Sequence, residues 1–330
     1  MTNNTQEHPF AEIIRILGKG KKGSRPLTQA EAYSAMQMIL NNEVEDLQLG
    51  AFLMLMRVKE ETSEELAGFV QAVRDSLPKT NCLADLDWSS YAGKRRHLPW
   101  FILSSLLLAE NGTKVLMHGS ASHTEGRIFV EDVLPLFSLP TNHSFSEAEQ
   151  QLQTRNFAYL SLSEICPAMN KMIHLRKLMG LRSPVHTLVR LINPFNADYS
   201  IQGIFHPSYR PVHQEAALLL KQKHMAVLKG EGGETERNPD MECLVQSVHE
   251  GELIDEMWPA LFPRRHMKPD TLEPEQLLQL WRGELEDEFA IASVIGTTAV
   301  ALKLLAKADT QAEAHELATS YWSNRNSNAY

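Results

Sequence analysis

Residues 90–97 hold the side chains whose types and spacing could do chemistry most directly. The loop follows a short candidate strand, contains no acidic residue, and carries Gly93, Lys94, Arg95, Arg96 and His97 in succession. The next residues have the pattern of a helix, and a helix N-terminus presents free N–H groups and the positive end of its dipole. The sequence therefore predicts a loop that can hold phosphate and that offers no ligand to a metal ion.

Charge is segregated along the rest of the chain. Residues 15–25 and 165–197 each carry five lysines and arginines and no acidic residue, whereas residues 231–256 carry nine acidic side chains and one arginine. The net charge of −9 argues against nucleic-acid binding over the whole surface. Net charge averages over surfaces that one partner never contacts together, so a local cationic groove is compatible with it.

Composition indicates a globular protein without a membrane span. The chain has 330 residues, 43% of them hydrophobic, which is enough for one large domain or two smaller ones. Its longest apolar stretch, 98–109, is too short to cross a bilayer, and its first ten residues lack the pattern of a signal peptide. We therefore expect a cytoplasmic protein. Cys82, Cys166 and Cys243 lie far apart and are expected to be buried free thiols.

Helix signals dominate the first 77 residues. They are helical spacing of apolar residues over 10–17, capping boxes at Thr28/Glu31 and Thr62/Glu65, and a candidate cap at Asp46. Beyond a polar link, β-type runs cover 113–118, 157–161, 199–205, 225–229 and 243–248. They alternate with helices expected over 98–111, from a capping box at Ser146/Glu149, over 167–180, 286–307 and 311–322. This alternation predicts an α/β fold with a mainly helical N-terminal domain and a mostly parallel sheet covered by helices.

Seven motifs resemble, in order and spacing, those of the anthranilate phosphoribosyltransferase family. They are RPLTQAEAYSAMQMIL, AFLMLMRVKEETSEELAGFVQAVR, the His118-Gly119 pair, CPAMNKMIHLRKLMGLRS, LINPFNA, GIFHPSYR and GEGGETERNPD. The resemblance implies a fold related to class II nucleoside phosphorylases. It would have a helical domain over 1–77, joined by returning helices near 166–194, and an α/β domain over 78–165 and 195–330. It also implies a homodimer formed through the helical domain.

The positions that match the family's substrate site have lost most of its polar groups. The Gly-Thr-Gly-Gly-Asp loop for phosphoribosyl pyrophosphate falls on 90–94, where one glycine is kept and Lys94 replaces the acid. The Asn-x-Ser-Thr turn falls on 100–103, and Lys-His-Gly-Asn-Arg falls on 117–121. The Asp-Glu pair that holds magnesium falls on Thr235 and Glu236, so one carboxylate is lost. We therefore expect no catalytic residue, metal or cofactor. The matches leave a vestigial substrate site at Ser90, Gly93, His118, Gly119, Cys166, Arg176 and Glu236.

Cationic side chains have replaced those groups, which resembles the divergent, YbiB-like branch of the family. The resemblance implies loss of transferase activity and binding of nucleic acid, with little sequence preference, in a groove between the domains. Phosphate contacts alone read no bases and would give that behaviour. The side chains expected to line the groove are Lys19, Lys21, Lys22, Arg25, Lys94, Arg95, Arg96, Lys171, Arg176, Lys177, Arg182 and Arg190. Tyr91, His97 and Trp100 are candidates for stacking on bases of a single strand, with core packing as the alternative for Trp100.

Two other function classes stay open. A transferase with a different phosphate-bearing donor would use His118, Arg176 and Glu236, with magnesium as its metal. A regulatory protein would recruit a partner through the acidic 231–256 segment or an apolar helix face. Each basic segment by itself also fits an ordinary solvated surface. The glycine-rich residues 230–234 fit a turn at a strand end better than a phosphate loop, because two of them are glutamates.

Overall fold

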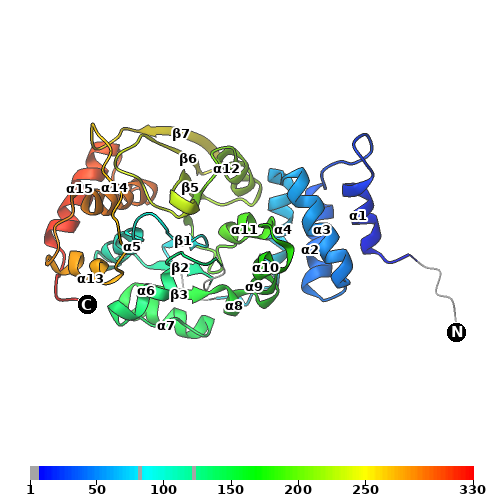
Figure 1. Cartoon of the computed structure of the whole chain (residues 1–330), viewed down its shortest axis with the longest axis horizontal. Helices are drawn as coiled ribbons and strands as arrows, with labels where there is room; N and C mark the ends of the chain where they lie inside the picture. Colours follow the sequence, from blue (N-terminus) through cyan, green and yellow to red (C-terminus); the bar gives the residue numbers. More distant parts are fainter. Residues whose placement is uncertain (1–6, 81–83, 121–123) are drawn as a thin grey trace.

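The computed structural model describes residues 7–80, 84–120 and 124–330, and it consists of a helical bundle beside an α/β domain (Figure 1). Cys82 and Ala121 lie outside the described residues. One seven-stranded sheet forms the centre of the α/β domain, in the order β3-β2-β1-β4-β5-β6-β7. Its strands are β1 (Leu86–Ser90), β2 (Val115–Gly119), β3 (Phe157–Ser161), β4 (Tyr199–Ile204), β5 (His224–Lys229), β6 (Cys243–His249) and β7 (Glu252–Trp258).

The sheet is parallel from β3 to β5, and β6 and β7 extend it as an antiparallel hairpin. Because the carboxyl ends of neighbouring parallel strands meet at one edge, the loops that follow β1, β4 and β5 lie together there. This edge brings residues 90–97 and 230–237 into contact, although more than a hundred residues separate them in the sequence.

Helices cover both faces of the sheet. In chain order they are α1 (Phe10–Gly18), α2 (Gln29–Leu40), α3 (Asp46–Lys59), α4 (Ser63–Ser76), α5 (Phe101–Glu110), α6 (Val130–Val133), η1 (Leu134–Phe137), α7 (Phe145–Arg155), α8 (Leu162–Ile165), α9 (Pro167–His174), α10 (Arg176–Met179), α11 (Val185–Leu188), η2 (Val189–Leu191), α12 (Tyr209–Leu219), η3 (Glu231–Gly233), α13 (Glu275–Arg282), α14 (Glu288–Leu304) and α15 (Gln311–Asn324). Among the described residues, no helix is both long and apolar enough to cross a membrane.

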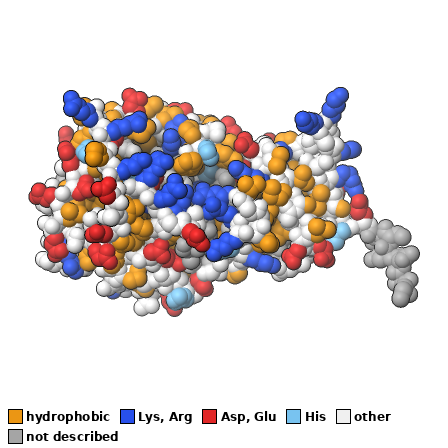
Figure 2. Space-filling view, in the orientation of Figure 1, with side chains coloured by type: hydrophobic (Ala, Val, Ile, Leu, Met, Phe, Trp, Pro, Cys, Tyr) orange, Lys and Arg blue, Asp and Glu red, His pale blue; other side chains and the backbone are white. Residues whose placement is uncertain are grey.

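The basic loop between α1 and α2 lies at the outer end of the bundle, away from the sheet (Figure 1). Its lysines are exposed, and cationic side chains project at that end of the molecule (Figure 2). Arg25 in this loop forms a two-point ion pair with Glu31, with both Nη–Oε distances at 2.7 Å. The loop therefore does not reach the sheet edge within one chain.

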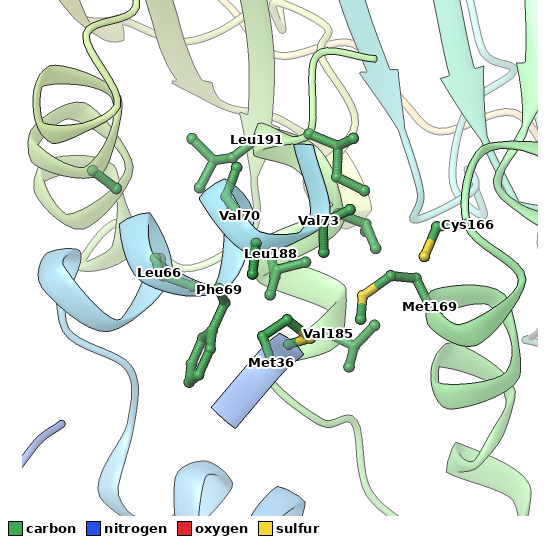
Figure 3. Packing of buried hydrophobic residues seen from close by; sticks show 14 of the residues in the cluster. Met36, Leu66, Phe69, Val70, Val73, Cys166, Met169, Val185, Leu188 and Leu191 are labelled. Carbon is green, nitrogen blue, oxygen red and sulfur yellow. The ribbon is translucent and has the colours of Figure 1, made fainter. Parts of the chain in front are cut away.

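Two hydrophobic clusters form the core, one on each face of the sheet. One cluster joins α5, α13, α14 and α15 to the sheet. The other is continuous from the sheet through α9, α11 and α12 into the bundle, where Val185 and Leu188 meet Leu66, Val70 and Val73 (Figure 3). The returning helices expected near 166–194 thus lie against α4. The Arg74 side chain reinforces this contact by donating to the carbonyl oxygens of Leu191 and Ile192, both at 2.8 Å.

The fold class predicted from the sequence is confirmed, and its errors are local. The capping boxes at Thr28 and Thr62 form as predicted, while the cap before α7 is Ser144 with Glu147 rather than Ser146 with Glu149. Strand β7 was not predicted, because as the edge strand it is largely exposed and carries charged residues. The exact domain limits stay a prediction.

Candidate functional site

The loop after β1 is filled by a carboxylate of the chain itself. The backbone N–H groups of Ala92 and Gly93 both donate to Oε1 of Glu234 at 2.6 Å, and Ser90 Oγ donates to its Oε2 at 2.8 Å. Gly93 has a φ of 66°, and a Cβ there would lie 2.9 Å from the Phe129 ring. The loop does have the shape of an anion cradle, but the expectation that it is open to a phosphate is wrong, because Glu234 occupies its donors.

Lys94 is an internal cation. Its side chain is 2% exposed, and Nζ lies 2.5 Å from Glu236 and 3.2 Å from Glu231. Burial alone would lower the pKa of Lys94, but the two carboxylates outweigh burial and raise the pKa above its ordinary value. The ammonium is therefore charged and neutralised in place. Its assignment as a groove residue needs correction, because it is buried in this ion-pair cluster.

A carboxylate of the chain also accepts a hydrogen bond from the N-terminus of the helix that follows the loop. Glu236 Oε2 accepts the Phe101 N–H at the start of α5, at 2.9 Å. Glu231 accepts the backbone N–H groups of Arg95 and Arg96 and contacts His97 Nδ1 at 2.8 Å. Burial would raise the pKa of Glu231, but its hydrogen bond to His97 and the Lys94 charge lower it to about 2. Three glutamates of the 231–236 segment thus accept the N–H donors of the loop and neutralise the charge of Lys94.

These residues do not fit magnesium. The ammonium of Lys94 lies between Glu236 and Glu231, where a divalent ion would need free carboxylate oxygens. Over the described parts of the chain, no three His, Cys, Asp or Glu side chains are grouped so that they could hold a metal ion. The Lys94 ammonium therefore takes the place that a divalent ion would need.

His118 is also enclosed. It is 0% exposed. Its Nδ1 lies 2.6 Å from the Tyr91 hydroxyl and its Nε2 lies 3.2 Å from Asp87 Oδ1. Gly119 next to it allows close strand contact, since a Cβ there would meet the Ser90 carbonyl at 2.3 Å. A substrate cannot reach these groups unless the loop moves.

A cluster of arginines lies beside the filled loop. Arg95 and Arg96 are exposed, and Arg127 Nη1 donates to the carbonyls of Ala92 and Gly93 at 2.9 and 3.0 Å. Burial, followed by the charge of Arg95, lowers the pKa of Arg127. The charge of Arg176 acts on the pKa of Arg127 in the same direction.

The same group of charges acts on the pKa of Arg182. Burial, followed by the charges of Arg127, Arg176 and Arg190, lowers the pKa of Arg182 to about 10. Glu234 acts in the opposite direction, but its oxygens are already bound by the loop. We define the arginine cluster as Arg95, Arg96, Arg127, Arg176 and Arg182. None of the five forms an ion pair with a carboxylate in the described ranges. Lys and Arg gather in the middle of one face of the molecule, between the α/β domain and the bundle (Figure 2).

Comparison with known proteins identifies the family. Residues 11–77 match the helical bundle domain of a glycosyl transferase family, and residues 102–326 match its a/b domain. The chain belongs to this glycosyl transferase family. It is similar to YbiB of Escherichia coli (strain K12), with 30% identity over 207 residues. That match covers 61% of this chain and 64% of YbiB, so it spans less than two thirds of that relative.

Other members of the glycosyl transferase family match over more of their length. The anthranilate phosphoribosyltransferase of Geobacillus kaustophilus is 27% identical over 310 residues, which is 91% of both chains. The structure of the Thermus thermophilus enzyme has a TM-score of 0.79 at 20% identity and covers 98% of this chain and 96% of its own. The Saccharomyces cerevisiae enzyme in complex with PRPP and Mg has a TM-score of 0.78 at 16% identity and covers 98% of this chain and 95% of its own. These structural matches establish the shared fold.

Apart from the buried Lys94 and Arg190, the predicted groove residues of this family member fall into three groups. Arg95, Arg96, Arg176 and Arg182 belong to the arginine cluster, and they are exposed or half-buried. Lys171 and Lys177 are exposed on α9 and α10, and their contact with a ligand stays a prediction. Lys19, Lys21, Lys22 and Arg25 lie apart, at the outer end of the bundle.

Arg190 needs a second correction. It is 6% exposed, and its guanidinium donates to the carbonyls of His186, Gly203 and Gly233. It therefore holds the end of β4 against η3 rather than facing a ligand. Cys166 is buried as a free thiol, and burial raises its pKa. Tyr91 and Trp100 are 1% and 4% exposed, so core packing accounts for both.

Sequence reasoning missed Arg127, Glu231 and Glu234 as site residues, and it named Glu236 as part of the vestigial substrate site rather than as the partner of Lys94. Arg127 is a single arginine whose place beside the loop depends on the bridge between Lys94 and Ile128, and no local pattern predicts that pairing. The glutamates did leave a signal. A loop rich in N–H donors and cations, and a second loop rich in Glu, both follow strands of one parallel sheet.

Proposed function

We propose that this chain is a non-catalytic member of the glycosyl transferase family that binds single-stranded nucleic acid, with little sequence preference, through the arginine cluster. One observation carries the proposal. The chain's own carboxylates fill the loop that resembles the family's pyrophosphate site, while the adjacent arginines have no carboxylate partner among the described residues. Such a surface favours polyanions over a small diphosphate substrate, because its charges are spread along the surface.

A small cavity supports phosphate binding next to the cluster. It measures about 110 Å³ and is lined by cationic or polar side chains that include Arg57, Arg182, His206 and Tyr209. A guanidinium binds phosphate oxygens through two parallel N–H donors, so Arg182, which lines this cavity, can hold one phosphate there. Phosphate contacts of this kind set the position of a strand without reading its bases.

Salt dependence tests the proposal. If the five guanidinium groups each neutralise one phosphate of a labelled 20-nucleotide strand, affinity should fall about a hundredfold between about 50 and 200 mM salt. Fluorescence anisotropy at several salt concentrations measures the slope. A flat response, or no binding at low salt, would overturn the proposal.

Substitutions locate the surface. R176A and R182A should each weaken binding to unrelated sequences alike and lower the salt slope by about 0.7. K21A and K22A are matched controls, because they remove charge from the outer loop. Each should change the affinity for the strand little. A greater loss in the controls would place the site on the bundle instead.

The two alternatives have less support. For a transferase with another donor, His118 and Glu236 are 0% and 4% exposed and both are held by protein groups. The acidic 231–256 segment is not one open face, since Glu234 and Glu236 are buried. Incubation with anthranilate, phosphoribosyl pyrophosphate and magnesium should yield no product, and steady turnover would contradict the non-catalytic assignment. The cytoplasmic location expected from the sequence stays a prediction.

A further inference from the structure

A second cavity begins next to the arginine cluster, because His97, which follows Arg95 and Arg96 in the chain, lines it. It measures about 180 Å³, and its lining includes His97, Trp100, Gln276, His266 and Phe289. Sites for drug-sized ligands usually measure about 300–1,000 Å³. This cavity is therefore large enough for one flat ring system rather than for a whole nucleotide.

Aromatic rings form the walls of this cavity. The His97 ring stacks on Phe289, with centroids 4.6 Å apart and an interplanar angle of 21°. His266 meets the same Phe289 edge-on at 5.6 Å. The His266 ring is fixed from behind, because Asp240 contacts its Nδ1 at 2.6 Å and accepts its backbone N–H at 2.8 Å. The walls are therefore ordered before any ligand arrives.

Polar groups at the cavity can form hydrogen bonds with the edge of a bound ring. The Gln276 side-chain amide, with both donor and acceptor atoms, has no hydrogen-bond partner in the described parts of the chain. Asp287 also lines the cavity, and its Oδ1 accepts the Ala290 N–H at the start of α14. Glu288 lies 3.7 Å from His266 Nε2 and makes that side of the rim unfavourable for phosphate.

Two groups of cationic residues adjoin lining residues of the cavity in the chain. His97 follows Arg95 and Arg96 directly, and Glu231 ties all three to one position. In the second group, Arg264, Arg265 and Lys268 are exposed and adjoin His266, and none of them has an ion-pair partner among the residues that the structure describes. A strand whose phosphates contact both groups would pass across the cavity mouth.

We infer that this cavity receives one unpaired nucleobase of the bound strand, stacked against the aromatic wall and contacted by Gln276. The inference rests on the proposed function and makes it more specific. A base inside a duplex cannot enter without being unpaired and flipped out, which costs free energy, so the cavity selects single strands. Stacking on aromatic side chains tolerates any base, in agreement with weak sequence preference.

Two strands of equal charge test the inference. One is a 20-nucleotide oligo(dT) and the other is the same backbone with an abasic spacer at each position. One base stack is worth about 1–3 kcal/mol, so the wild-type chain should bind oligo(dT) about 5- to 150-fold more tightly than the abasic strand. H266A and Q276A should each reduce this preference, measured as the ratio of the two affinities. Q279A, on the exposed side of α13, is the matched control.

The outcomes separate this inference from the proposed function. Equal, salt-dependent binding of both strands would overturn the inference and leave the function intact. Failure to bind either strand would overturn both. A preference that survives H266A and Q276A, in variants with unchanged thermal stability, would place the base contacts elsewhere. Competition by free thymidine at the concentration where the strand binds would mean that the cavity serves a small molecule instead.

Discussion

Lys94 lies in an interior that would exclude a lone ammonium. Its partners Glu236 and Glu231 keep it charged, and the Phe101 N–H shares the Glu236 carboxylate. Each charged group in this cluster pairs with another, so the stability lost on removing one group depends on which groups remain. The cluster is therefore better described as one unit than as separate ion pairs.

Single substitutions should expose that dependence. K94M leaves two carboxylates without their cation and should lower the free energy of unfolding by about 3–5 kcal/mol, as should E236Q, which leaves the ammonium poorly paired. The double variant K94M/E236Q should lose clearly less than the sum. Urea denaturation at neutral pH measures all three.

A surface pair provides the control for this cycle. Lys223 and Asp198 are 2.8 Å apart, and both side chains are 55% exposed. K223M should leave the free energy of unfolding nearly unchanged, because solvent screens an exposed pair. Strictly additive losses at Lys94 and Glu236 would contradict the coupled cluster.

At the scale of elements, α2 and α4 approach each other through a glycine. A Cβ on Gly68 would lie 2.2 Å from the Gln29 carbonyl oxygen and 2.8 Å from the Ala32 Cβ. Backbone meets backbone at this crossing, so a side chain there would push the two helices apart. The bundle face that carries α9 and α11 depends on the position of α4.

Two glycine substitutions test this close approach. G68A should lower the free energy of unfolding by about 1–3 kcal/mol through overpacking. G50A, within α3, meets no atom within 4 Å and should raise it by about 0.5–1 kcal/mol, because alanine favours the helix. Thermal and urea unfolding of both variants give the comparison. Equal changes in the free energy of unfolding of the two variants would mean that helix propensity alone sets the effect of each substitution.

At the scale of the whole molecule, the bundle leaves apolar side chains exposed. Leu47 and Val58 on α3 are 86% and 80% exposed, and Leu178 on α10 is 85% exposed. Leu47 and Val58 are eleven residues apart and therefore share one face of the helix. We propose that this face joins two copies of the chain through their helical domains.

Oligomeric state tests that proposal. The wild-type chain should sediment as a dimer, and L47E/V58E should sediment as a monomer, because a buried unpaired carboxylate is costly at an apolar interface. M257E, at an exposed position on β7, is the control and should remain dimeric. A monomeric wild type at about 100 μM would contradict a stable dimer of the standard kind.

The sequence alone determined what depends on neighbours along the chain. Capping boxes at Thr28 and Thr62, the β-type run of β3 and the C-cap at Gly180 are set by residues within a few positions, so they were predictable. The acid-free loop before α5 belongs to the same class. These local features also carried the resemblance to the family.

Only the tertiary structure decided which charges are free. Residues 94 and 236 meet because β1 and β5 flank β4 and end at the same edge, and that contact turns a predicted open cation into a buried one. The charge of Arg127 acts on the pKa of Arg182, and neither side chain forms an ion pair with a carboxylate in the part of the chain that the structure describes. Charge neutralisation acts through space over a few ångströms, whereas sequence patterns report order along the chain. The cationic character of the segment was therefore visible in the sequence, and its availability to a ligand was not.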